Sequence, residues 1–122
     1  MSILLTHFRW SDFDSPGEPG SGSNMQISTL ELLEKARGLA GIPFIVTSGF
    51  RSEAHNAELE HSVQGSAHTK GHAIDVSCRT SQQRYKIVKA LFEVGFNRIG
   101  IGKTFIHFDN DPDKPANCIW VY

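Results

Sequence analysis

The chain has 122 residues, of which 39% are hydrophobic and 20% are charged, and its formal net charge is −1. This length suits a monomer with one domain over residues 1–122, and the ordinary composition excludes disordered and fibrous classes. The near-neutral charge predicts no nucleic-acid partner, and the longest apolar stretch, residues 41–46, is too short to insert into a membrane.

The first predicted segment is an N-terminal arm and ordered surface loop over residues 1–24. Its start, "MSILLTHFRWSDF", lacks the basic residues, apolar run and cleavage site of a secretory signal. Residues 11–24 are rich in Ser, Gly, Pro and Asp, which is typical of loops. We therefore expect the protein to stay in the cytoplasm of the cell that makes it.

Hydrophobic periodicity predicts three helices and five strands after the arm. In residues 81–95, the side chains of Tyr85, Val88, Leu91 and Phe92 recur at the spacing of a buried helix face. Strands and helices do not alternate regularly, so we expect an α+β fold, with a small, mostly antiparallel sheet flanked by helices. The expected helices are 25–41, 52–61 and 81–95, and the expected strands are 43–48, 71–77, 97–102, 104–109 and 118–122.

The stretch "GSAHTKGHAID" (65–75) carries two histidines and a carboxylate. His68 and His72 are four residues apart, the spacing at which a helix presents two imidazoles to one ion. Gly71 lies between them and the preceding residues are poor helix formers, so we expect no helix and reject this pair.

A different set joins His68 to Asp75 and His107. Residues 71–77 alternate as a strand whose small side chains share a face with Asp75, which leaves space for an ion. His107 lies in another predicted strand (104–109) and needs a partner there. Zinc binds imidazole nitrogen and carboxylate oxygen, and a catalytic site takes three protein ligands plus water. The alternative is a hydrogen-bonded histidine–aspartate pair without metal.

Three motifs in this chain resemble those of one enzyme family. "SAHTKGHAID" (66–75) fits an S-x-H-x-x-G-x-A-x-D signature, "TSGFRSEAHN" (47–56) precedes it, and "GIGKTFIHFD" (100–109) follows it, with an aromatic residue at Trp120. In this order they resemble the zinc D-Ala-D-Ala carboxypeptidase family of peptidoglycan peptidases. That family belongs to the larger group of lysostaphin-type peptidases and the hedgehog domain.

The resemblance implies a zinc peptidase with a hedgehog/DD-peptidase-like fold. Its substrate would be a peptidoglycan stem peptide or cross-bridge, cut as a carboxypeptidase or an endopeptidase. The segment "FRWSDFDSPGEPGSGSN" (8–24) is similar to the opening of small phage-encoded members. This implies an endolysin-like protein that accumulates in the cytoplasm of a phage-infected bacterium and acts on the wall after release.

Site roles follow from the matched positions. His68, Asp75 and His107 fall on the zinc-ligand positions of the family. Arg51 matches an arginine that faces the zinc and holds substrate or developing charge; its alternative is a surface arginine.

Three more matched positions have two interpretations each. Ser66 either supports the ligands by hydrogen bonding or is a simple turn residue. Trp120 lines the cleft or belongs to the core. Asn56 matches a family asparagine, and we expect it to brace the loop that carries Arg51.

The general base is the open question. Several branches of the family carry an acid three residues before the last ligand, where this chain has Thr104. Asp109 lies two residues after His107 on the same strand face, and is either the base or a partner that orients a ligand or the arginine. Cys118 stands where relatives often carry a basic residue, so a substrate contact from that position is not expected.

Two other functions compete with the enzyme. A non-catalytic binding or virion-structural module on the same fold is favoured by Thr104 in place of the acid. A metal-free hydrolase would use Ser66 or Cys78 as its nucleophile, but no G-x-S-x-G motif accompanies them.

Overall fold

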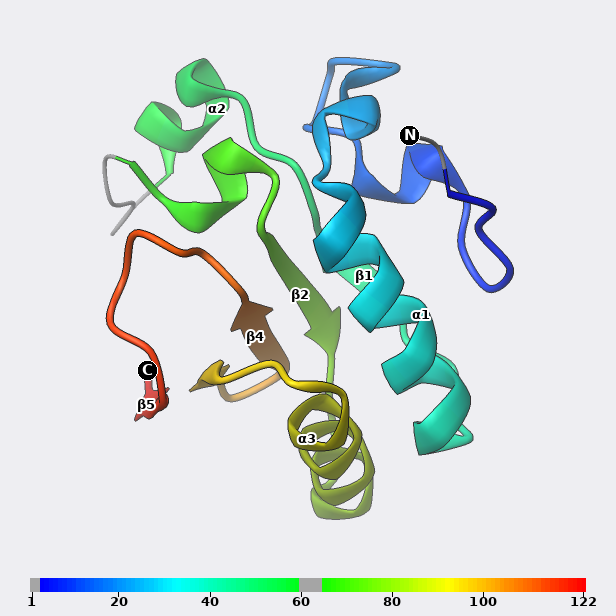
Figure 1. Cartoon of the computed structure of the whole chain (residues 1–122). Coiled ribbons are helices and arrows are strands. Elements are labelled where there is room, and N and C mark those ends of the chain that lie inside the picture. Colours follow the sequence, from blue (N-terminus) through cyan, green and yellow to red (C-terminus); the bar gives the residue numbers. More distant parts are fainter. Residues whose placement is uncertain (1–2, 60–64) are drawn as a thin grey trace.

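The computed structural model describes residues 3–59 and 65–122, which form an α+β domain (Figure 1). Within these residues, the predicted arm forms two 3-10 helices, and a third precedes the second strand. The helices are η1 (Trp10–Phe13), η2 (Ser21–Asn24), α1 (Ile27–Ala40), α2 (Glu53–Glu58), η3 (Ala67–Lys70) and α3 (Ser81–Val94). The strands are β1 (Val46–Ser48), β2 (Ala73–Ser77), β3 (Arg98–Ile101), β4 (Phe105–Asp109) and β5 (Cys118–Val121).

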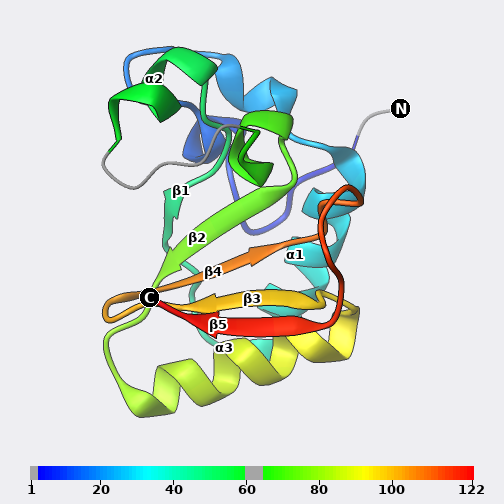
Figure 2. The same ribbon diagram turned by 90° about the vertical axis from the view of Figure 1, so that its left-hand side faces the viewer.

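The five strands form one sheet in the order β1-β2-β4-β3-β5. The pairs β1–β2, β2–β4 and β4–β3 are antiparallel, and β5 pairs in parallel with β3 at the edge of the sheet (Figure 2). The predicted α+β class with a mostly antiparallel sheet is therefore confirmed.

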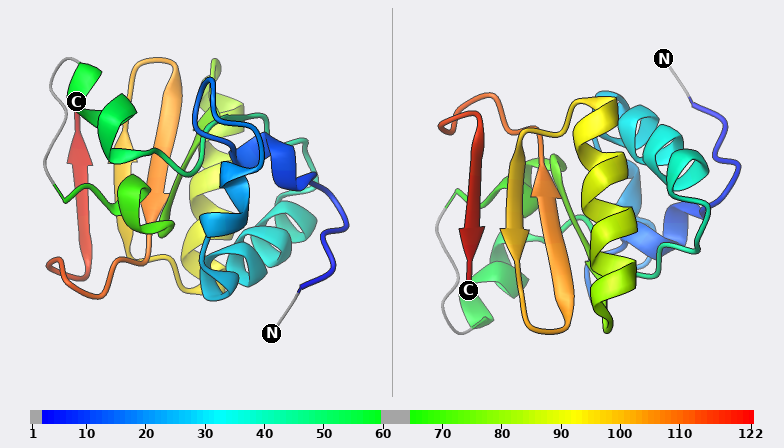
Figure 3. Two further views of the ribbon diagram at one scale, coloured as in Figure 1. Left: turned by 90° about the horizontal axis from the view of Figure 1, so that it is seen from above. Right: turned by 90° about the horizontal axis from the view of Figure 1, so that it is seen from below.

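The sheet has one apolar face and one polar face. α1 and α3 pack together on one side of the sheet, whereas α2 and η3 lie on the other side (Figure 3). Ile74 and Val76 of β2 and Ile106 and Phe108 of β4 are fully buried in the core that the sheet shares with α1 and α3. Because side chains alternate along a strand, the residues between them point to the polar face.

The buried face of α3 differs from the prediction. Tyr85 is 67% exposed and Phe92 is 46% exposed, whereas Leu91 is buried as predicted, together with Ile87 and Ala90. The apolar residues of this helix occupy more than one side, so two different stripes satisfy helical spacing. The stripe that contains Ile87 and Ala90 faces α1 and the sheet.

Several expected element bounds shift in the structure. The strand expected at 43–48 is a strand only over Val46–Ser48. The helix expected at 52–61 is helical over Glu53–Glu58, and its expected last two residues lie outside the described part.

The segment before β2 docks against the N-terminal arm. η3 ends at Gly71, whose φ of 77° is in the left-handed region, which glycine adopts without strain. A Cβ at this position would collide with the carbonyl oxygen of Asn24, and the Gly71 carbonyl accepts a hydrogen bond of 2.9 Å from the amide of Gln26. The turn that carries His68 is thereby fixed to the body of the domain.

The arm is ordered, as expected, but it also contributes to the core. The side chains of Phe8 and Phe13 are buried, and the Phe13 carbonyl accepts a hydrogen bond of 2.9 Å from the amide of Phe50. The arm therefore supports the loop that leads to Arg51. Over the described residues, no helix has the length and apolarity that a membrane crossing would require.

Candidate metal centre

Three side chains from separate elements converge on the polar face of the sheet. His68 comes from η3, Asp75 from β2 and His107 from β4. Nε2 of His68 lies 3.3 Å from Oδ1 of Asp75 and 3.3 Å from Nδ1 of His107, and the last two atoms are 2.9 Å apart. The three atoms form a nearly regular triangle.

The size of this triangle suits a metal ion. A tetrahedral ion with bonds of about 2.0–2.1 Å separates its ligand atoms by about 3.3–3.4 Å. Two of the three observed distances are 3.3 Å, and the third is 2.9 Å. His68, Asp75 and His107 are thus a group that could hold a metal ion.

Strand register brings two of these groups together. Asp75 and His107 are direct partners in the antiparallel β2–β4 pair. Directly opposite residues project to the same face with their Cβ atoms about 5 Å apart. The burial of Ile74 and Phe108 on the apolar face keeps Asp75 and His107 on the polar one.

The orientation of His68 is fixed by the backbone. Its Nδ1 lies 2.8 Å from the carbonyl oxygen of Gly49, and the residue is only 3% exposed. A carbonyl can only accept a hydrogen bond, so Nδ1 donates to it, and Nε2 is the nitrogen that faces Asp75 and His107 and that a metal ion could bind. The hydroxyl of Ser66 accepts a hydrogen bond of 3.3 Å from the amide of His68 and caps η3.

His107 is oriented from the other side of its ring by Asp109. Nε2 of His107 lies 2.7 Å from Oδ2 of Asp109, while Nδ1 faces Asp75. Burial alone would lower the pKa of His107, but the hydrogen bonds with Asp109 and Asp75 outweigh it and raise that pKa. Each ring nitrogen of His107 thus faces a carboxylate oxygen, and a metal ion bound at Nδ1 would take the place of a proton there.

Both carboxylates of this cluster are held in the ionised form. Burial raises the pKa of Asp75, but the hydrogen bonds with His107 and His68 outweigh it and keep the pKa below its ordinary value. Burial likewise opposes ionisation of Asp109, and the hydrogen bond with His107 is the largest of the effects that lower its pKa. Asp75 can therefore serve as an anionic ligand.

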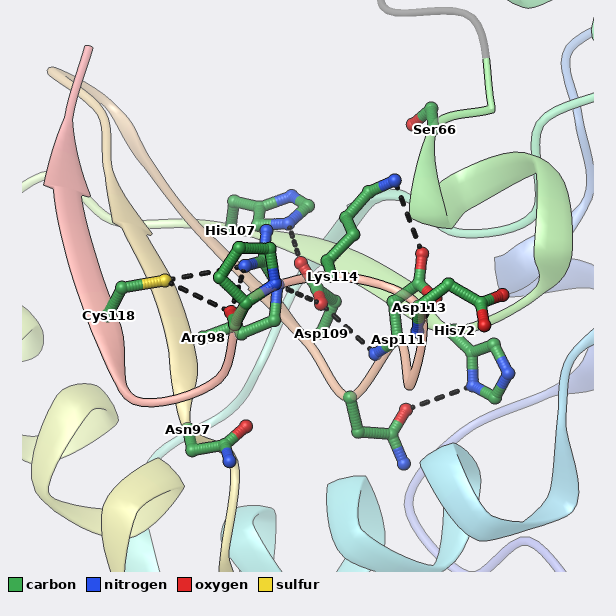
Figure 4. A network of polar contacts seen from close by, with 12 residues as sticks. Ser66, His72, Asn97, Arg98, His107, Asp109, Asp111, Asp113, Lys114 and Cys118 are labelled. Atoms are coloured by element: carbon green, nitrogen blue, oxygen red, sulfur yellow. Dashed lines mark hydrogen bonds and ion pairs between the residues drawn. The ribbon is translucent and has the colours of Figure 1, made fainter.

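Asp109 is engaged at both of its oxygens. Oδ2 faces His107, and Oδ1 accepts hydrogen bonds of 2.8 Å from Nε of Arg98 and 3.1 Å from the amide of Asp111 (Figure 4). The residue is 1% exposed. These contacts favour an orienting role for Asp109 over that of a proton acceptor.

Arg51 lies beside the cluster on the segment that follows β1. Its Nη1 donates to Oδ1 of Asn56 at 3.1 Å, and its Nη2 donates to the hydroxyl of Ser48 at 3.3 Å. Asn56 braces Arg51, as the resemblance implies. Burial lowers the pKa of Arg51, partly offset by the negative charge of Asp75, although an arginine remains a cation at any physiological pH.

The cluster opens into a pocket of about 650 Å³. Trp120 forms part of its wall, with its ring centroid 5.4 Å from that of His107. The indole lies over Gly100, where a Cβ would approach Nε1 of Trp120 to 2.6 Å. Besides the three converging groups, the lining includes Arg51, Ser66, Phe105, Lys114, Trp120 and Tyr122.

Three other residues considered in the sequence analysis make contacts outside the metal cluster. Thr104 is exposed just before β4, and its carbonyl accepts a hydrogen bond of 2.9 Å from the amide of Cys78. His72 contacts Asn110 through Nδ1 at 3.1 Å, on the opposite side of β2. The sulfur of Cys118 lies 3.3 Å from Nη1 of Arg98.

Sequence reasoning missed Arg98, Lys114 and Tyr122 as pocket residues. Arg98 was open to detection, because alternation along the predicted strand 97–102 puts it on the same face as Gly100. Lys114 lies in the β4–β5 connection, where no periodicity applies.

Comparison with known proteins identifies the family. A search of curated proteins finds no match to the chain. The sequence model described as Peptidase M15 matches residues 8–109, which include all three converging side chains and end at Asp109. The resemblance drawn from the motifs is thereby confirmed, and the chain belongs to the peptidase M15 family of zinc D-Ala-D-Ala carboxypeptidase-like proteins.

Proposed function

We propose that the protein is a zinc-dependent peptidase that hydrolyses peptide bonds in peptidoglycan. The observation that carries this proposal is the triangle of ligand atoms from His68, Asp75 and His107. Both imidazoles have one nitrogen tied to an acceptor, so that the other nitrogen of each ring faces one point. This arrangement of outer partners is usual for metal-binding histidines.

The donor set favours zinc among common metal ions. Two imidazole nitrogens and one carboxylate oxygen are typical of a catalytic zinc site with three protein ligands and one open position. Bound there, zinc would supply the Lewis acidity that polarises a carbonyl group and acidifies water. The open position would face the pocket, where a substrate can reach it.

We propose that Arg51 binds negative charge on the substrate. Its two described side-chain hydrogen bonds go to the neutral groups of Asn56 and Ser48. Its positive charge is therefore not neutralised by a directly bonded carboxylate in these contacts. A fixed cation beside the metal centre can stabilise a developing oxyanion or hold a substrate carboxylate.

Asp109 is, in this proposal, a positioning residue. Its Oδ2 fixes the ring of His107, and its Oδ1 is occupied by Arg98 and the amide of Asp111. A general base needs an oxygen within reach of the proton that it removes. Both oxygens of Asp109 already have partners, so although the residue lines the pocket, neither oxygen is free to take a proton in these contacts.

The substrate proposed is a stem peptide or cross-bridge, cut either at the chain end or internally. Family membership supports the peptide class. The pocket combines a cationic group, Arg51, with aromatic surface from Trp120 and Tyr122, which suits a short peptide with a carboxylate and small apolar side chains. An endolysin-type role, proposed from the N-terminal resemblance, fits the same substrate.

Digestion of purified cell walls tests the proposal directly. Walls with different cross-bridges are incubated with the zinc-loaded protein, with the chelated protein, and with the chelated protein after zinc is restored. Mass spectrometry of the released fragments identifies the bond that is cut. We expect cleavage that is lost on chelation and restored by zinc; equal cleavage in the chelated sample would contradict the proposal.

A non-catalytic wall-binding module is the second candidate, and one observation favours it. The carboxylates that line the pocket within the described residues are Asp75 and Asp109, and both are engaged with histidines. Thr104 lies outside the pocket lining. Zinc-loaded protein that sediments with cell walls but releases no fragment from any wall type would support this candidate.

A further inference from the structure

We propose that Arg98 is a positioning residue for the metal centre, acting on His107 through Asp109. The inference rests on the proposed metal site, but it concerns a residue outside the three ligands. Arg98 lies on β3, where its Cα partner on β4 is Asp109 and its Cα partner on β5 is Cys118. Its side chain therefore projects to the polar face, two residues along β3 from Gly100, which is the partner of His107.

The ion pair between Arg98 and Asp109 is almost completely buried. Nε of Arg98 donates to Oδ1 of Asp109 at 2.8 Å, and the two side chains are 11% and 1% exposed. A buried carboxylate that loses its cationic partner is left with an uncompensated charge, which is strongly destabilising. The side chain of Asp109 would then have to move to find another partner, and its hold on His107 would weaken.

The guanidinium of Arg98 is locked by further contacts. Nη1 donates to the carbonyl oxygen of Pro115 and lies 3.3 Å from the sulfur of Cys118. Its central carbon lies 5.0 Å from the ring centroid of Trp120, in a cation–π arrangement. These contacts leave little freedom for the guanidinium to turn, so Nε stays directed at Asp109.

A chain of contacts thus runs from β5 to the metal cluster. The β4–β5 connection holds Arg98, Arg98 holds Oδ1 of Asp109, and Oδ2 of Asp109 holds Nε2 of His107. With Nε2 occupied, Nδ1 of His107 is the nitrogen available to a metal ion. Arg98 has no described contact with the three ligand side chains, so its effect must pass through Asp109.

A double-mutant cycle on zinc affinity tests this series of contacts from Arg98 through Asp109 to His107. The full-length wild type, Arg98→Gln, Asp109→Asn and the double variant are titrated with zinc against a chelator of known affinity. Arg79→Gln, the same change at an exposed arginine, is the control. We expect Arg98→Gln to weaken zinc binding by about 10-fold, toward the lower end of the range for outer partners of a ligand. We expect the double variant to bind zinc within about 2-fold of Asp109→Asn, since residues in one network are not additive.

A spectroscopic readout separates positioning from general loss of structure. In the zinc-loaded wild type, the Nε2 proton of His107 should give a slowly exchanging NMR signal, because Asp109 holds it. This signal should be lost in Arg98→Gln and kept in Arg79→Gln. Unchanged zinc affinity in Arg98→Gln, additive effects in the cycle, or a retained signal would each overturn the inference.

The remaining outcomes are also decisive. If Arg98→Gln does not fold, the cycle is repeated with Arg98→Lys, whose ammonium can keep the ion pair but not the contacts to the β4–β5 connection. A smaller loss of zinc affinity that is non-additive with Asp109→Asn supports the inference, and no loss or an additive one overturns it. Failure of the wild type itself to bind zinc would instead refute the proposed function.

Discussion

Asp75 and His107 lie directly opposite each other on β2 and β4, with Oδ1 of Asp75 2.9 Å from Nδ1 of His107. Most of the site is built from the row of paired residues that contains these two and crosses the sheet from strand to strand. This row continues across the sheet in both directions, so a shift of one residue between two strands would move its side chains to the apolar face. Its members are Ser48, Asp75, His107, Gly100 and Trp120.

The first prediction concerns the ligands. Asp75→Ala and His107→Ala should each reduce bound zinc from about one ion per chain to nearly none, because two remaining ligands hold zinc weakly. Elemental analysis after dialysis measures this ratio. His55→Ala, a histidine of α2 outside the pocket lining, should keep its zinc. Unchanged zinc content in both ligand variants would refute the assignment.

The same variants can show whether zinc bound at this cluster stabilises the folded protein. A ligand that binds only the folded state stabilises it by mass action. The melting temperature of the wild type should therefore rise with added zinc, whereas that of His107→Ala should stay constant. A zinc-dependent rise in His107→Ala equal to that of the wild type would place the ion elsewhere.

The second prediction separates the two roles of Asp109. If it positions His107, Asp109→Asn should bind zinc about 10- to 100-fold more weakly, and saturating zinc should restore most of the turnover. If it is the general base, turnover should stay at least about 100-fold low at saturating zinc. Peptidase assays across a zinc titration distinguish these results. Asp113→Asn, at a 75% exposed aspartate on the β4–β5 connection, serves as the control.

The sequence was sufficient to predict that His68, Asp75 and His107 come together, because two local patterns coincide there. Alternation along two strands put Asp75 and His107 on polar faces, and a motif specific to one family added His68. This alternation comes from the burial of neighbours such as Ile74 and Phe108. It can therefore be predicted from the sequence of each strand alone, without knowing which strands pair. The α+β class could also be predicted, because the order of helices and strands along the chain is a local feature of the sequence.

The contacts that depend on pairing could not be predicted. Arg98 meets Asp109 only because β3 lies beside β4 in one register, and no local pattern fixes that register. The exposed side of α3 was also wrong in the prediction, since Tyr85 and Phe92 satisfy helical spacing as well as Ile87 does. In both cases tertiary packing selects among alternatives that the local sequence allows equally.

The third prediction concerns Arg51. Arg51→Ala should keep zinc binding within about 2-fold, because the described contacts of its guanidinium are with Asn56 and Ser48 rather than with a ligand. Its kcat/KM should fall by about 100- to 1,000-fold, the range for loss of a group that stabilises an oxyanion. Arg51→Lys should be intermediate, since lysine keeps the charge without the fork.

Zinc titration and steady-state kinetics on a defined stem peptide measure these two quantities for Arg51. Arg79→Ala is the matched control at an exposed position. Normal kcat/KM in Arg51→Ala would show that this cation plays no part in the reaction. A parallel loss of zinc would show instead that it supports the cluster.

The fourth prediction concerns the wall of the pocket, which depends on a missing side chain at Gly100. A Cβ there would lie 2.6 Å from Nε1 of Trp120 and 2.8 Å from the ring of Tyr122, so both rings must move in Gly100→Ala. Overpacking of this kind costs about 1–3 kcal/mol in stability. The displaced indole would leave its place beside His107 and enter water.

Fluorescence measures this displacement in a Trp10→Phe background, where Trp120 is the remaining tryptophan of the two. The emission of Gly100→Ala should shift to longer wavelength, and kcat/KM on the stem peptide should fall because the wall beside the metal centre is lost. Gly38→Ala is the matched control, since nothing lies within 4 Å of a Cβ at that helical position. Unchanged emission together with an unchanged melting temperature would mean that Trp120 does not lie over Gly100, and that the aromatic wall is formed differently.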